Sequence, residues 1–391
     1  MRGSAERVAS AFAHRAPDRT PLFEMFQQYH PIHWELCGRT VATDEALCWD
    51  ALADGISWEE LTEEDARAFF AIARHFELDI VHIPPIRPRE LPRPMKLGPG
   101  RWRLDGVHYA LHPRTRLVVL EDPSQDYADS RKISEQERIR EIESWDGTVQ
   151  RADSECPRVF RRVQEMAVAE GLDWRYMGEV GAGTGVAFYP PFQLMWVVSE
   201  PDLLRRWLEM VKAPAFYETQ RQISWGCDII VMGGDVSSDK GPFLSPAHYR
   251  EFILPVIQEH IELIHRWGAL AVYTSDGNHW PIVEDFFFNS RADGYQEVDK
   301  AAGMTMERLV AEGIDARVCI LGNIDARHAL CLGTTEQVKA EVRRCLELGQ
   351  VTPGGHILHT SHSVHEGVQA ANYHAMVDAY REFFGLAPLP R

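Results

Sequence analysis

Polar and titratable side chains recur in this sequence directly beside short apolar runs. In chain order they are Glu24, Asp79 with His82, Glu179, Asp235, Asp276, Glu297, Asn323 with Asp325, and His359 with His362. Carboxylates and imidazoles exchange protons, hold metal ions and bind substrates by hydrogen bonds. If several carboxylates share a cavity, they repel one another unless a proton, a cation or a substrate offsets their charge, and this repulsion shifts pKa values at functional sites.

Each of these residues, taken singly, also has a structural explanation. Loops are polar in any globular protein, and an Asp or Asn after a strand often caps the next helix. The whole set is harder to explain in this way, so we expect a functional site. Within it we assign substrate binding to Glu24, His82, Glu179, Asp235 and Asn323.

The elements that must position these residues alternate between short apolar runs and longer amphipathic segments. Predicted strands cover residues 22–25, 79–83, 174–180, 229–232, 269–273, 294–298, 318–321 and 356–359. Eight parallel strands would close a (β/α)8 TIM barrel, in which catalytic groups project from the C-terminal strand ends. We therefore predict the α/β class and one barrel domain over residues 1–391, with these polar side chains at one rim.

Other segments refine this arrangement. Ser245 and Pro246 start a predicted helix over 249–267, and Thr334 starts one over 337–348. Residues 84–122 are rich in Pro, Gly and Arg and predict a β-hairpin insertion, which we expect over the barrel mouth. The charged stretch 129–146 predicts a solvated surface helix.

Composition excludes several functional classes. The net charge of -17 argues against nucleic-acid binding, which needs clustered Lys and Arg. No apolar run reaches the roughly 18 residues of a membrane span, and the N-terminus lacks a signal-peptide core, so we expect a cytoplasmic protein. The seven cysteines are dispersed without a CxxC pair, which favours buried free thiols.

An ordered set of motifs resembles the uroporphyrinogen decarboxylase superfamily. It comprises "GGDVSSDKGPFLSPAHYREFILPV", "SDGN", "GNID", "GTTEQVKAEV", "GGHILHTSHSV" and "AANYHAM", between Met232 and Met376. The resemblance implies a homodimeric barrel enzyme and three catalytic positions. Asp79 in "FELDIVHIPP" would stabilise a positive charge that develops on the substrate, Tyr189 in "GAGTGVAFY" would orient the substrate, and His362 in "TSHSV", which lacks the family's flanking glycines, would exchange a proton.

The sequence also departs from the pattern of the decarboxylases. Where those enzymes carry paired arginines that grip the carboxylates of the porphyrin precursor, this chain reads "EMFQQYHP", with Glu24 and Gln27. Without these guanidinium groups a highly carboxylated tetrapyrrole loses its bidentate anchors. We therefore expect a carboxy-lyase that decarboxylates a small, non-porphyrin carboxylated substrate.

The corrinoid methyltransferases of the same superfamily provide an alternative. Their zinc ligands are a His and a Cys in an H-x-C-G element and a later Cys, whereas the matching positions here are Thr274, Asp276 and His362. Both thiolates are absent. Asp276, Glu297 and His362 would instead offer oxygen and nitrogen donors, which suit Zn, Mn or Fe. The sequence leaves both a metal-dependent and a metal-free site open.

Three functions thus compete. The first is the decarboxylase, and the second is a methyltransferase-like enzyme that uses a corrinoid carried by a partner protein. The third is a binding module without catalysis, because a shared fold does not fix a function. The first two share a small-molecule substrate, and metal analysis with a methyl-transfer assay would separate them.

Overall fold

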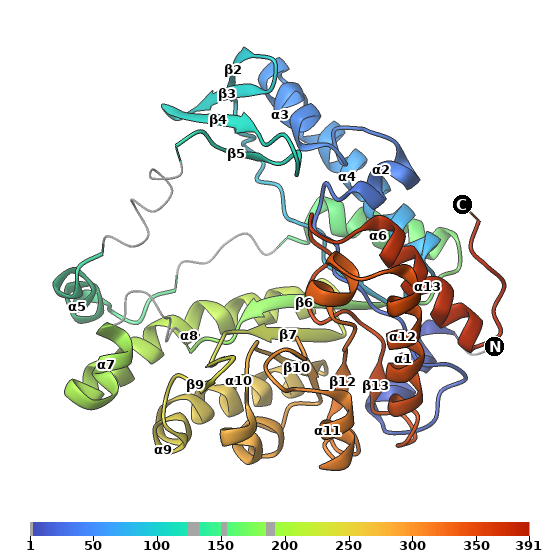
Figure 1. Ribbon diagram of the computed structural model, residues 1–391. Coiled ribbons are helices and arrows are strands. Elements are labelled where there is room, and N and C mark those ends of the chain that lie inside the picture. The colour runs from blue at the N-terminus through green and yellow to red at the C-terminus, as the bar shows by residue number, and fades with distance from the viewer. Residues whose placement is uncertain (1–2, 123–132, 150–154, 185–191, 391) are drawn as a thin grey trace.

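The computed structural model describes residues 3–122, 133–149, 155–184 and 192–390 (Figure 1). At its centre lies a curled parallel sheet of seven strands in the order β1-β6-β7-β10-β11-β12-β13. The strands are β1 (Ile80–His82), β6 (Arg175–Gly181), β7 (Ile229–Gly233), β10 (Leu270–Thr274), β11 (Gly294–Gln296), β12 (Cys319–Leu321) and β13 (His356–Ile357). The predicted α/β class and the parallel sheet are confirmed, and the bounds of each of the seven strands lie at most two residues from the predicted ones.

The sheet is open between β13 and β1, where the prediction placed a strand over 22–25. This segment forms isolated bridges instead, because Leu22 pairs with Leu358 on one side and Phe23 with Ile80 on the other. The architecture is therefore TIM-barrel-like, and the gap is spanned by two bridges rather than by an eighth regular strand.

Alternating residues of the strands fill the inside of the curled sheet. The inner cluster includes Ile80, Ile229, Val272 and Leu321, and Phe12 of α1 (Ser4–Phe12) packs against it. The parallel strands present their other face to the surrounding helices, so both faces are buried as expected for βα units. Because the interior of the curled sheet is packed, a ligand of the sheet itself has room at the ends of the strands rather than between them.

Helices cover the outside of the sheet and follow most strands in turn (Figure 1). The longer ones are α4 (Trp58–His75), α6 (Arg158–Ala169), α8 (Pro201–Ser224), α10 (Leu254–Arg266), α12 (Thr335–Gly349) and α13 (Ala370–Phe383). The predicted helix over 249–267 begins with a π-helical turn, Tyr249–Ile253, before α10. Thr334 caps α12 with a capping box, as its sequence indicates.

Shorter elements complete the chain. They are α2 (Pro31–Cys37), α3 (Glu45–Asp54), α7 (Phe192–Ser199), β8 (Ser237–Ser238), β9 (Gly241–Pro242), α9 (Pro246–His248), α11 (Met306–Ala311) and the turns η3 (Trp280–Ile282), η4 (Glu284–Asn289) and η5 (Ala326–Cys331). The predicted surface helix appears as α5 (Glu135–Ser144), although the first part of the predicted range lies outside the described residues. No described helix is long and apolar enough to cross a membrane.

The insertion over 84–122 contains more than the single hairpin that was predicted. It forms a four-stranded antiparallel sheet of β2 (Met95–Gly98), β3 (Arg101–Leu104), β4 (Val107–Leu111) and β5 (Val118–Leu120). The sheet packs on α3, and the two stand apart from the curled sheet in Figure 1. Trp102 is fully buried there, and its indole Nε1 donates to Asp50 Oδ1 at 3.0 Å.

Candidate functional site

Three residues predicted as metal ligands meet at the C-terminal end of the sheet. Asp276 follows β10, Glu297 directly follows β11, and His362 lies in the loop after β13. One potential ligand atom from each side chain lies within 4.8 Å of the other two. His362 Nδ1 is 3.5 Å from Asp276 Oδ1. The fold therefore brings together an oxygen, oxygen and nitrogen donor set, which we call the triad.

The charge of the triad is poorly compensated. Burial raises the pKa of Asp276 to about 8, and the negative charges of Glu297, Asp235 and Asp299 add to this effect. Burial also raises the pKa of Glu297, against a hydrogen bond from Thr274 and the charge of His362. Two neighbouring carboxyl groups with raised pKa values need a proton or a cation between them.

Two observations show that the triad residues fit a metal ion. Asp276 Oδ1 is buried and has no hydrogen-bond partner among the described residues. Glu297 is held in place, since Thr274 Oγ1 donates to its Oε2 at 2.7 Å and its backbone adopts a left-handed φ of 63°. Non-glycine residues rarely adopt this conformation, and such residues concentrate at functional sites.

The turn that carries Asp276 is fixed by a close backbone approach. Gly277 has a φ of +95°, and a Cβ at this position would lie 2.6 Å from the carbonyl oxygen of Ser238. The buried ring of His279 anchors the same turn, with Nδ1 2.9 Å from Ser237 Oγ and Nε2 2.9 Å from the oxygen of Ser275. Sequence reasoning missed these supporting residues, although "SDGN" marks the turn.

Asp235 lies beside the triad, as predicted, in the loop after β7. Its Oδ1 is 3.5 Å from the backbone nitrogen of Asp276, and its side chain is exposed. Asp235 thus adds negative charge at the solvent side of the triad.

A second polar cluster is formed by Glu24, His359 and Gln296, whose side chains are at most 3% exposed. His359 Nδ1 lies 3.2 Å from Glu24 Oε1, and His359 Nε2 lies 3.3 Å from Gln296 Nε2. His359 Nε2 can accept from the amide of Gln296, whereas its Nδ1 has no hydrogen-bond partner among the described residues. Glu24 Oε2 and Gln296 Oε1 also remain without a partner among the described residues. The cluster thus offers two acceptor atoms to a ligand.

Of this cluster, Glu24 was predicted to bind substrate and His359 was recognised at a strand end. Gln296 was missed because it is the last residue of β11, and a single Gln inside an apolar strand gives no chemical signal. The cluster lies next to the triad because Gln296 directly precedes Glu297 in the chain, and the charge of His359 lowers the pKa of Glu297.

His82 and Glu179 form a pair at the ends of neighbouring strands β1 and β6. His82 Nε2 lies 3.2 Å from Glu179 Oε2, and this hydrogen bond lowers the pKa of Glu179. The Glu179 side chain is 52% exposed, so the pair faces solvent. It is placed at the predicted rim, with its role in substrate binding still a prediction.

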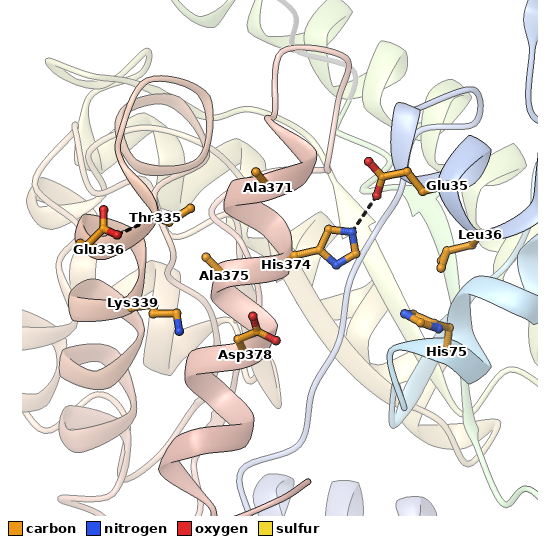
Figure 2. A pocket seen from close by; sticks show the side chains of 10 residues that line it. All are labelled: Glu35, Leu36, His75, Thr335, Glu336, Lys339, Ala371, His374, Ala375 and Asp378. Carbon is orange, nitrogen blue, oxygen red and sulfur yellow. Dashed lines mark hydrogen bonds and ion pairs between the residues drawn. The ribbon is translucent and has the colours of Figure 1, made fainter. Parts of the chain in front are cut away.

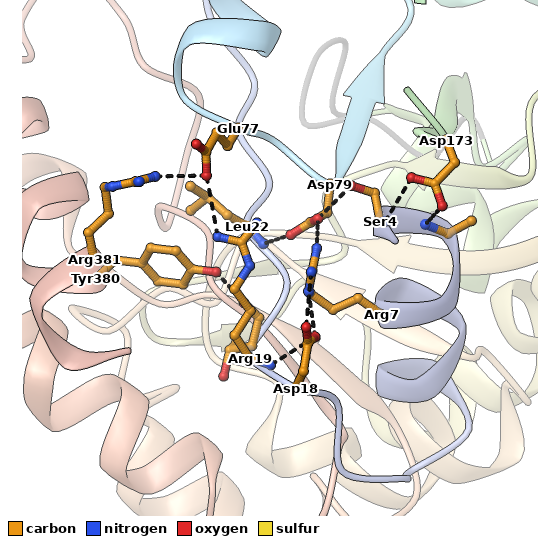
Figure 3. A network of polar contacts seen from close by, with 12 residues as sticks. Ser4, Arg7, Asp18, Arg19, Leu22, Glu77, Asp79, Asp173, Tyr380 and Arg381 are labelled. Atoms are coloured by element: carbon orange, nitrogen blue, oxygen red, sulfur yellow. Dashed lines mark hydrogen bonds and ion pairs between the residues drawn. The ribbon is translucent and has the colours of Figure 1, made fainter. Parts of the chain in front are cut away.

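The predicted position of Asp79 is wrong. Asp79 precedes β1, so it lies at the N-terminal edge of the sheet, opposite to the triad. Its carboxylate is fully buried and bonds Arg7, Ser4 Oγ and the backbone nitrogen of Leu22 (Figure 3). These contacts tie α1 to the sheet and account for the burial of Asp79.

Two further predicted positions have structural contacts. Asn323 follows β12, but its side-chain amide donates to the oxygen of Met304 at 3.2 Å. Asp325 caps η5 by accepting from the backbone nitrogen of His328 at 2.8 Å. Asp325 matches the helix-capping explanation of polar residues after strands, whereas Asn323 binds a backbone carbonyl of a neighbouring loop. Tyr189, the third predicted catalytic residue, lies outside the described residues.

A groove of about 570 Å³ lies elsewhere, on the outer surface between α2, α4, α12 and α13. His374 and Glu35 face each other across it at 2.8 Å, with His75 beside them (Figure 2). None of the predicted site residues lines this groove, so it forms no part of the candidate site.

A family model described as "Uroporphyrinogen decarboxylase (URO-D)" matches residues 156–383. The chain therefore belongs to the uroporphyrinogen decarboxylase family. A uroporphyrinogen decarboxylase from Chlorobium luteolum is 25% identical over 274 residues, which cover 68% of this chain and 73% of the relative. One from Chlorobium phaeovibrioides is 26% identical over 217 residues, and the match spans 58% of its length.

A solved structure, a methyltransferase from Methanosarcina mazei, shares the fold. The TM-score is 0.63, with 17% sequence identity, and the match covers 98% of this chain and all of the other. At this identity the likeness concerns the fold alone. The family match supports a decarboxylase-like enzyme that acts on a small molecule.

Proposed function

We propose that this protein is a metal-dependent, methyltransferase-like enzyme whose triad holds one divalent cation. The observation that carries the proposal is the convergence of Asp276, Glu297 and His362, with the unpartnered Oδ1 of Asp276 among them. A cation would offset the burial and the neighbouring negative charges that raise the pKa of both carboxyl groups. This choice favours the alternative of the sequence analysis over the decarboxylase.

The donor set indicates the kind of cation and of substrate. Two carboxylates and an imidazole suit Zn, Mn or Fe and differ from the thiolate sites that activate thiols. When bound, such a cation supplies Lewis acidity to an oxygen or nitrogen atom of the substrate. We therefore propose a substrate that reacts through oxygen or nitrogen.

The protein's own residues would orient this substrate. Thr274 fixes Glu297, and the acceptor atoms of Glu24 and Gln296 would bind hydrogen-bond donors of the substrate. His82, Glu179 and Asp235 would line the solvent side. Under this proposal a corrinoid on a partner protein carries the methyl group, and two copies of the chain form a homodimer.

A decarboxylase is the second candidate, favoured by the family match and by the Chlorobium relatives. In this case His362 would exchange the proton that replaces CO2, and Tyr189 would orient a small carboxylated substrate. Asp79 has no part in this candidate, because it lies at the opposite edge of the sheet.

The first experiment measures metal binding, and the second measures methyl transfer. The purified protein is stripped with a chelator and titrated with Zn2+ or Mn2+ by calorimetry, and Asp276→Asn is compared with Asp239→Asn, an exposed aspartate in the neighbouring loop. We expect one metal per chain for the unchanged protein and for Asp239→Asn, and at least tenfold weaker binding for Asp276→Asn. Equal binding by both variants would refute the triad as the metal site.

Transfer is then assayed with methylcobalamin as the donor and a panel of alcohol, amine and thiol acceptors. The proposal predicts metal-dependent demethylation with an oxygen or nitrogen acceptor. Stoichiometric metal binding without any demethylation would reject methyl transfer and favour the decarboxylase.

A further inference from the structure

A cleft of about 600 Å³ lies beside the start of α4 and α6, outside the site described above. Six of its twelve lining residues are arginines, and only Glu155 and Glu165 among them are acidic. The arginines are Arg87, Arg89, Arg158, Arg161, Arg162 and Arg221. The whole chain has 41 Lys and Arg against 58 Asp and Glu. Among the lining residues cations therefore outnumber anions, the reverse of the whole chain, while Asp65, Glu63 and Glu218 behind them pair with Arg87, Arg162 and Arg221.

Three of the arginines sit where cations are unfavourable. Arg158, Arg161 and Arg162 occupy the first turns of α6, which has no acidic residue in its first turn. The N-cap Pro157 has no side chain that could accept from the free backbone N–H groups. The positive end of the helix dipole and the guanidinium groups both favour the binding of an anion at this place.

Carboxylates behind the cleft hold several guanidinium groups in fixed orientations. Arg87 Nε donates to Asp65 at 2.8 Å, and Arg162 Nε donates to Glu63 at 3.2 Å. Guanidinium groups that are oriented in advance lose less entropy when they bind a planar or tetrahedral anion.

Arg161 is the arginine of α6 least engaged with carboxylates. Its Nη2 donates to the oxygen of Cys156 at 3.4 Å, and no ion pair of Arg161 is found within the described ranges. Its remaining N–H groups can therefore bind a ligand in the cleft.

We propose that this cleft binds a small organic anion with two or more negative charges, carried by phosphoryl or carboxylate groups. Guanidinium groups bind both kinds of oxyanion in a bidentate manner. The ring of Trp58 and the side chain of Ile86, which is 51% exposed, give the cleft an apolar wall for the organic part. The site is independent of the triad and of its reaction.

Calorimetry on the full chain tests the proposal with tripolyphosphate and citrate as probes. We expect saturable binding of at least one probe, weakened about tenfold or more by Arg161→Gln and less by Arg161→Lys, which keeps the charge. The control is Arg344→Gln on α12, an arginine that is 56% exposed and pairs with Glu307 and Glu347. This control should bind as the unchanged protein does. Circular dichroism verifies that each variant is folded.

Every result of this titration either supports or overturns the proposal. Binding of tripolyphosphate alone supports a phosphorylated ligand, binding of citrate alone supports a polycarboxylate, and binding of both supports an oxyanion site of either kind. Absence of saturable binding, or equal weakening by Arg161→Gln and Arg344→Gln, overturns the proposal, because the effect of charge would then be unspecific.

Discussion

His362 Nδ1 and Asp276 Oδ1 lie 3.5 Å apart, although the two residues belong to loops after different strands, β13 and β10. The approach is possible because parallel strands bring their C-terminal ends to one edge of the sheet. Glu297 completes the group from the end of β11, the strand that lies between β10 and β12 in the sheet.

Thr274 should position Glu297 without touching the metal. Thr274→Val removes the hydroxyl that donates to Glu297 Oε2 but keeps the shape of the side chain. Loss of such a supporting contact typically weakens metal binding about 10- to 100-fold. The titration with Zn2+ should show this loss, and Thr274→Ser, which keeps the hydroxyl, should restore most of the affinity. Unchanged affinity in Thr274→Val would contradict this positioning role.

Gly277 should be intolerant of any side chain. Gly277→Ala places a methyl group against the carbonyl of Ser238, whereas Gly268→Ala meets nothing within 4 Å at a similar positive φ. Both variants suffer the strain of the left-handed backbone, about 1 kcal/mol, but only Gly277→Ala also displaces the turn that carries Asp276. Urea unfolding should show a larger loss for Gly277→Ala, with loss of metal binding. Equal stabilities would show that the backbone contact is unimportant.

Asp79 should matter for stability rather than for catalysis. Asp79→Ala leaves Arg7, which is 3% exposed, without one of its two carboxylate partners. Breaking a buried ion pair costs about 3–5 kcal/mol, so the urea midpoint should fall markedly. The folded variant should still bind one metal ion with unchanged affinity. A stable Asp79→Ala protein that fails to bind metal would show that the two edges are coupled.

Acid should destabilise the protein before its carboxylates titrate. Burial lowers the pKa of His33, His260 and His356 to about 4. In the unfolded chain these imidazoles have a pKa of about 6.5, so the unfolded state binds more protons between about pH 6.5 and pH 4. Stability is thus complete above about pH 6.5 and falls as the pH drops. Urea midpoints measured at about pH 7 and pH 5 should differ, and equal midpoints would refute this origin of acid sensitivity.

The strands and the triad could be predicted because their signals are local. Each strand is a short apolar run, and Asp276, Glu297 and His362 lie at the end of such a run or within three residues of it. The prediction that these residues lie close together came from the parallel arrangement of the strands. In a parallel sheet the C-terminal ends of all strands lie at the same edge. The segment 22–25 failed as a strand because only Leu22 and Phe23 pair with their neighbours.

Asp79 was predicted at the wrong edge of the sheet because β1 has only three residues, so that a polar residue lies close to each of its ends. Asp79 precedes the strand and His82 ends it, so the two face opposite edges, and a predicted range of 79–83 hides this difference. Gln296 and Thr274 were missed or misjudged for another reason. Their roles come from contacts with distant residues, His359 and Glu297, which composition and spacing do not encode.

A crystal structure of the protein soaked with Zn2+ or Mn2+, with an anomalous difference map, tests the central claim most directly. The account predicts one strong peak about 2.0–2.2 Å from an oxygen of Asp276, an oxygen of Glu297 and a nitrogen of His362. A map without a peak at this position, or with the metal bound elsewhere, would contradict it.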